Sequence, residues 1–126
     1  MEQLASELAE NLEAFRALFH APENCDFVVR ELAPHGVRMA ALYIDGMANR
    51  RNLEDMVLRP LMNMRPFGGM APEGRSAALA AQVLPTGTGK LESGVRKIAD
   101  FVLDGNCAVL CDGCAQAVLA EMPGFS

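Results

Sequence analysis

The apolar run from Val37 to Ile44, VRMAALYI, constrains the fold of this chain more than any other segment. Its composition favours a β-strand, yet it is apolar at nearly every position and not at alternate positions. A strand with one solvated face alternates, whereas a continuous apolar strand is buried on both faces. The run therefore predicts a strand that lies inside the protein.

A second β-rich run precedes this strand and predicts an antiparallel hairpin. Phe27 to Leu32 is joined to the apolar run by Ala33 to Gly36, where a Pro and a Gly suit a tight connection. Asp45-Gly46 ends the hairpin. A helix should follow, because Asn52 and Asp55 have the spacing of a helix N-terminus with reciprocal capping.

Pro60 lies inside the apolar stripe of that helix and should kink or shorten it. Amphipathic spacing predicts further helices elsewhere in the chain. They are an opening helix with apolar residues from 4 to 19, a short helix over Ser76–Gln82, and a helix over Val95–Val102 with Gly105 as its C-terminal left-handed residue.

A second hairpin is expected near the end of the chain. Asn106–Leu110 and Ala115–Glu121 flank Cys111–Cys114, whose central Asp-Gly favours a two-residue type I′ turn. Val83-Leu84 is a further candidate for a short strand, before a turn over residues 85–89. The elements together predict an α/β (α+β) fold, a mixed sheet with two antiparallel hairpins and amphipathic helices packed on it.

Size and charge restrict the class of protein. The 126 residues suit a single domain, residues 1–126. With 16 acidic and 11 basic residues, the chain carries a formal charge of −5, so nucleic acid and anionic lipid are not expected partners. No apolar run approaches the roughly 20 residues of a membrane span and no secretory signal is visible, so this segment is expected to be soluble.

Four cysteines without a secretory signal favour reduced thiols in a cytosolic compartment. Cys107, Cys111 and Cys114 have the spacing of a radical-enzyme iron–sulfur motif, but a strand and a turn would hold Cys107 about 13 Å from Cys111. That separation excludes a shared metal. We expect no metal and no cofactor, with the thiols filling a buried strand face. A zinc site that includes Cys25 and a His, and a reversible disulfide between Cys111 and Cys114, stay open as alternatives.

No catalytic constellation emerges, and the chain is expected not to be an enzyme. Residues 85–90, PTGTGK, resemble the end of a phosphate-binding loop, but Leu84 and Leu91 replace its required Gly and its Ser or Thr. His20 and His35 are not near a candidate nucleophile in sequence. The residues 85–90 are therefore read as a plain turn.

Charged residues in the first strand admit two interpretations. Asp26, Arg30 and Glu31 would protect an exposed edge strand, or they would form an ion pair or ligand contact. The eight methionines likewise suit an adaptable core or a contact surface.

The segment from Asp26 to Met62 resembles the N-terminal soluble domain of the A subunits of spore germinant receptors, the GerA type family of spore-forming Firmicutes. The resemblance is carried by Asp26 with Arg30-Glu31, by Tyr43-Ile44-Asp45-Gly46, and by the helix end Leu58–Met62. The later Ala99–Gly113 resembles the family's helix, Gly and short strand ending in Asp-Gly.

This resemblance implies a non-catalytic cytosolic domain that takes part in nutrient-germinant sensing or signal transmission. It implies that the chain is the first lobe of a two-lobed soluble region, with Asp26, Arg30 and Asp45 as ligand or interface residues. Other receptor subunits would be its partners, a nutrient germinant would bind through the complete two-lobed region, and a homo-oligomer is compatible. The full-length protein would reside in the spore inner membrane through a downstream region. A self-contained interaction or assembly module and a cysteine-based metal protein or enzyme are the alternatives.

Overall fold

A computed structural model describes residues 1–21, 23, 26–84 and 89–122 of the chain. The strands are β1 (Phe27–Leu32), β2 (Met39–Ile44), β3 (Lys90–Glu92), β4 (Cys107–Cys111) and β5 (Ala117–Ala120). The α-helical segments are α1 (Leu8–Leu18), α2 (Arg50–Leu53), α3 (Arg59–Met62), α4 (Arg75–Ala78) and α5 (Val95–Leu103). The shorter segments are η1 (Pro34–Gly36), η2 (Glu54–Leu58), η3 (Pro72–Gly74) and η4 (Leu79–Val83).

The five strands form one sheet in the order β1-β2-β4-β5-β3. This arrangement confirms the α+β fold and its two antiparallel hairpins, β1–β2 and β4–β5. Each described pairing is antiparallel, so the sheet is not mixed in parallel and antiparallel strands as expected. The reason lies in the strand order: β3 and β4, which α5 connects, run in the same direction, but β5 lies between them and pairs antiparallel with both.

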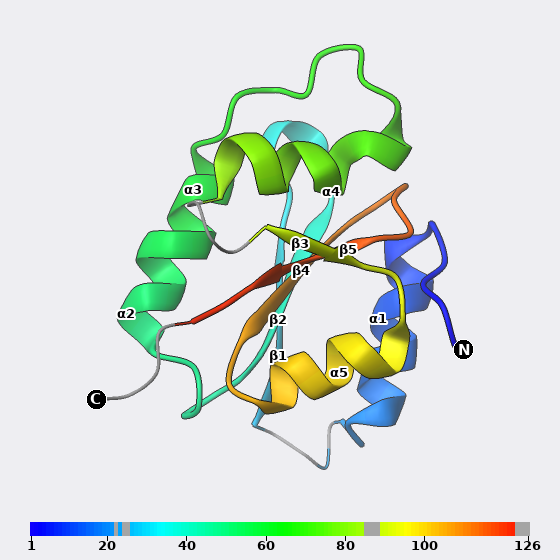
Figure 1. The fold of residues 1–126 in the computed structure, drawn as a ribbon, viewed down its shortest axis with the longest axis vertical. Helices are drawn as coiled ribbons and strands as arrows, with labels where there is room; N and C mark the ends of the chain where they lie inside the picture. Colours follow the sequence, from blue (N-terminus) through cyan, green and yellow to red (C-terminus); the bar gives the residue numbers. More distant parts are fainter. Residues whose placement is uncertain (22, 24–25, 85–88, 123–126) are drawn as a thin grey trace.

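Helices cover both faces of the sheet (Figure 1). On one face α1 and α5 pack on Ala40, Leu42 and the alternate residues of β4. On the other face α2, α3 and α4 pack on Met39, Ala41 and the remaining residues of β4. Because β2 and β4 are covered on both sides, their apolar residues need not alternate with polar ones. The predicted double burial of the apolar run is confirmed from Met39 to Leu42.

The helix after the first hairpin begins earlier than predicted. Asn49, and not Asn52, is its N-cap, because the Asn49 side chain accepts a hydrogen bond from the Asn52 N–H at 3.1 Å. The helix continues through the π turn η2 into α3, which contains Pro60. A π turn widens the helix just before a residue that has no N–H to donate, so the helix passes through Pro60 and ends at Met62.

Both hairpin connections are longer than the predicted four residues (Ala33–Gly36) for the first and two for the second. Leu32 pairs with Met39, so the first hairpin closes over six residues that include η1. Leu110 pairs with Ala117 across the second. The prediction of a type I′ turn is wrong, because Asp112 lacks the positive φ that such a turn requires and only Gly113, at φ 87°, has it.

Several remaining predictions have mixed outcomes. The helices near residues 76–82 and 95–102 are present, and Gly105 has the expected left-handed conformation at φ 96°.

The strand predicted at Val83-Leu84 is wrong, because Val83 ends η4 and Leu84 is a buried residue that follows it. Strand β3 was missed because it is short and polar. The turn predicted at residues 85–89 lies largely outside the described residues, as does Cys25.

One buried amide anchors the start of the chain. Asn11 on α1 is fully buried, and its side chain both accepts from the Ala5 N–H and donates to the Ala5 C=O, each at 2.8 Å. The segment before α1 is thereby fixed against the helix that follows it. Without the Asn11 amide, the Ala5 N–H and C=O would lose their hydrogen-bond partners, which would lower the free energy of unfolding.

We expect Asn11→Ala to lower the free energy of unfolding by about 2 kcal/mol, because it leaves the Ala5 N–H and C=O without their partners. Asn63→Ala is the matched control, since the Asn63 amide is exposed and bonds only within its own helix. That change should cost less than about 0.5 kcal/mol. Urea unfolding of both variants measures the difference, and equal losses would contradict the role of Asn11.

Candidate functional site

The end of the first hairpin forms a hollow that contains two of the three predicted site residues. Arg30 on β1 and Asp45 just after β2 both line a cavity of about 300 Å³. Its other lining residues are Tyr43, Ala48, Arg50, Leu53 and Glu54. The third predicted residue, Asp26, lies beside Asp45 in the strand pairing, because its C=O accepts the Asp45 N–H at 2.7 Å.

A tight turn positions Asp45. The N–H groups of Met47 and Ala48 both donate to the Ile44 C=O at 3.2 Å, and Gly46 has a φ of 88°. The Asp45 carboxylate then reaches Arg50 in the first turn of α2, with 3.3 Å between Oδ1 and Nη2. This ion pair is exposed, so it contributes little to stability and stays accessible to another charged group.

A second hollow of about 290 Å³ lies next along β1 and shares Arg30 with the first. Glu31, Leu32 and Ala33 also line its strand side, and Leu58 and Met62 line its helix side. Sequence reasoning missed this helical wall. The signal was present, because Glu54, Leu58 and Met62 recur at four-residue intervals and so lie on one face of a helix.

The resemblance-based residues therefore gather at β1, which is an edge strand of the sheet as one interpretation of its charges predicted. Glu31 points to the other face, where it contacts Arg16 at 3.9 Å and Arg38 at 3.4 Å. Arg30 has no ion pair with any described residue. Its charge is available to a group from outside.

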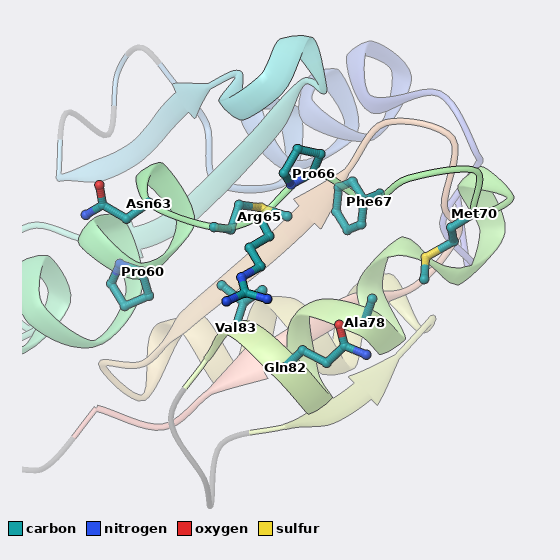
Figure 2. Close-up of a pocket in the computed structure, with 10 residues that line it drawn as sticks. Pro60, Asn63, Arg65, Pro66, Phe67, Met70, Ala78, Gln82 and Val83 are labelled. Carbon is teal, nitrogen blue, oxygen red and sulfur yellow. The ribbon is translucent and has the colours of Figure 1, made fainter.

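A third hollow, of about 310 Å³, lies between α3, the loop after it, and the helix formed by α4 and η4 (Figure 2). Arg65 extends across it toward Val83, below Pro66 and Phe67 of the loop. Nearby, the Arg75 guanidinium stands 5.8 Å from the centre of the Phe67 ring. Neither His20 nor His35 lines this hollow, although His35 Nε2 is 2.6 Å from the C=O of Met64, which does.

The loop that carries Cys111-Asp112-Gly113-Cys114 is occupied by packing contacts. The Asp112 carboxylate accepts the Leu8 N–H at 2.9 Å, and the Asp112 C=O accepts from Arg75 Nη1 at 2.6 Å. Cys114 Sγ lies 3.2 Å from the Glu73 C=O. Within the described residues, no three His, Cys, Asp or Glu side chains are placed to hold a metal ion.

Burial makes the cysteine thiols poor acids. Burial raises the pKa of Cys107 to about 12, against a small opposing effect of a backbone hydrogen bond at Leu42. Burial, followed by the nearby Cys114, also raises the pKa of Cys111 to about 12. Nucleophiles and metal ligands require the thiolate, so these two side chains act as small apolar residues of the core.

We expect Gly46→Ala to lower the free energy of unfolding by about 1–2 kcal/mol, because an L-residue is strained at this φ. A Cβ at Gly46 would meet no atom within 4 Å, so crowding adds nothing. Gly69→Ala is the control, because that position is equally open and has no positive φ. Chemical denaturation should show a loss only at Gly46; a similar loss at Gly69 would contradict the argument.

We expect alkaline pH to destabilise the protein through its buried thiols. The unfolded thiol has a pKa near 8.5 and the folded Cys107 a pKa of about 12, so the unfolded state releases its proton first. The stability contribution is intact below the unfolded pKa and falls by about 1.4 kcal/mol per pH unit above it. Cys107→Ala should reduce the slope of stability against pH by that amount between pH values of about 9.5 and 11. Urea unfolding across this range measures both slopes, and equal slopes would contradict the assignment.

Comparisons with known proteins show the fold and the family of this chain. The crystal structure of the N-terminal domain of the A subunit of the Bacillus megaterium spore germinant receptor GerK3 is similar to this chain, with a TM-score of 0.73 at 16% sequence identity. The likeness covers 98% of each chain and shows a shared fold. No curated protein matches, and no described helix has the length and hydropathy needed to cross a bilayer. The family model of the Bacillus/Clostridium GerA spore germination protein matches residues 13–126, so the chain belongs to the GerA spore germination family.

Proposed function

We propose that this chain is a non-catalytic, cytosolic N-terminal domain of a germinant-receptor A subunit that takes part in nutrient sensing or signal transmission. The observation that carries the proposal is the family match over residues 13–126, joined by the fold shared with the GerK3 domain. The domain would act as the first lobe of a larger soluble region. Other receptor subunits would be its partners, and the spore inner membrane the site of the complete protein.

The geometry of β1 supports a binding role for the proposed residues. Arg30 and Asp45 line one hollow, and Asp26 is joined to Asp45 through the backbone. The hollow is open and lined by both positive and negative side chains, which suits a zwitterionic nutrient or a complementary protein surface. A ligand bound there would couple to the receptor if it favoured one arrangement of the lobes over another.

The chemistry of the described residues supports a role without catalysis. The polar groups of the Asp112 loop are engaged in hydrogen bonds, and the Cys107 and Cys111 thiols are held in the protonated form. Neither predicted histidine is bonded to a thiol or hydroxyl in the described structure. Binding and coupling are therefore the activities that these side chains support best.

We expect Arg30→Ala in the full-length receptor to reduce the rate of nutrient-triggered germination by about tenfold, which corresponds to the loss of one charge-assisted contact. Arg96→Ala is the control, because Arg96 is exposed on α5 and lies outside the hollow. The germination rate of spores that carry each variant is measured with nutrient and with a trigger that bypasses the receptors. A normal nutrient response of the Arg30 variant, at normal receptor levels, would contradict a role for this site.

A further inference from the structure

The two hollows at β1 form one groove beside an exposed strand edge. Each has a volume near 300 Å³, and Arg30 lines both. The strand wall includes Arg30, Glu31 and Leu32, and the helix wall includes Glu54, Leu58 and Met62. Six strand residues extend about 20 Å, so a small molecule would fill one hollow while only an extended chain could span both.

The backbone of β1 presents unused hydrogen-bonding groups along this groove. Asp26 and Asp45 form a hydrogen-bonded pair, so the alternation of an antiparallel ladder directs the N–H and C=O groups of Val28, Arg30 and Leu32 toward β2. The same groups of Val29 and Glu31 then point to the free edge. No described residue outside the sheet bonds to them.

We propose that this groove binds an extended segment of another polypeptide, which adds a strand antiparallel to β1. Its side chains that face α2–α3 would be an apolar residue opposite Leu32 and, two residues later, an acidic residue opposite Arg30. The apolar side chain fills the hollow beside Leu58, which is 5% exposed, and Met62, which is 57% exposed. The acidic side chain pairs with Arg30, which lines the same hollow as Asp45 and Glu54 but forms no ion pair with a described residue.

A second copy of this chain fits the groove less well. Pairing two β1 strands through Val29 opposite Val29 pairs residues 27–31 of both copies, so Arg30 faces Val28 of the copy and finds no anion. A shifted register brings Arg30 opposite Asp26 of the copy, but it leaves Glu31 and Leu32 unpaired. The hollow at Leu32 and Met62 then stays empty. A separate segment with the apolar-x-acidic pattern satisfies both ends.

Strand docking deepens the proposed function, because it names the kind of partner that Arg30 would contact. It rests on the proposed function only for the assumption that the partner belongs to the germinant receptor. Its test uses the 126-residue chain and synthetic peptides. Absence of peptide binding to the unaltered chain, together with a germination defect of Arg30→Ala spores, would overturn the strand-docking proposal alone. Peptide binding together with normal nutrient-triggered germination of Arg30→Ala spores would overturn the sensing role of Arg30 alone.

The probe is an octapeptide, capped at both ends, with Thr at each odd position and Val, Leu, Asp and Val at the even ones. Titration followed by NMR should give saturable shifts along β1, and exchange of the Val29 and Glu31 amides should slow while that of Val28 and Arg30 changes little. Arg30→Glu should weaken binding by about tenfold, and replacing the peptide's Asp by Lys should restore it on this variant.

Two further variants test the apolar end of the groove. Met62→Ala should weaken peptide binding by about fivefold, because the exposed Met62 side chain would cover the Leu of the bound peptide. Met70→Ala is the matched control at another exposed methionine and should leave affinity unchanged. Absence of binding at millimolar peptide, tighter binding of the Lys peptide to the unaltered chain, or a dimer in sedimentation that protects Val29 and Glu31 without peptide would each overturn the proposal.

Discussion

A single loop residue, Asp112, joins the two helical layers at one end of the sheet. Its carboxylate accepts the N–H of Leu8, the first residue of α1, while its C=O accepts from Arg75, the first residue of α4. A carboxylate at a helix start satisfies a donor that has no partner within the helix and interacts favourably with the helix dipole. The positions of both layers over β4 therefore depend on the conformation of this loop.

This dependence gives the Cys-Asp-Gly-Cys sequence a role in packing. Gly113 has a φ of 87°, and a Cβ there would lie 2.6 Å from the Pro72 Cβ, so the position requires Gly both for its backbone and for its contact. Cys111 and Cys114 are small apolar side chains that fit beneath the same segment. A spacing that resembles a ligand motif here reflects close packing of a loop against η3 and α4.

The sequence predicted those elements whose pattern reflects burial. The unbroken apolar character of β2 and the stripe of α5 are direct consequences of the layers that cover them. Predictions failed where distant contacts decide a local choice: Asn49 and Asn52 are equally good caps by type, and Asp112-Gly113 has a sequence suited to a tight hairpin but is held open by α1 and α4. The resemblance proposed Arg30 and Asp45, and the structure places both beside one hollow. The spacing of Leu58 and Met62 indicates a shared helix face, but only the packing of that helix beside β1 makes it a wall of a hollow.

The same layering restricts where a partner can contact the sheet. Strands β2, β4 and β5 are paired on both sides, so free backbone groups occur only at β1 and β3. Strand β3 has three residues, whereas β1 has six and is flanked by α2–α3 along two hollows. Charged residues on an edge strand commonly prevent unwanted pairing. On β1, Glu31 forms ion pairs with Arg16 and Arg38, whereas Arg30 forms none with a described residue, and under the strand-docking proposal Arg30 would select for an anion. Protection of the edge and choice of partner can thus arise from adjacent charges that point to opposite faces of one strand.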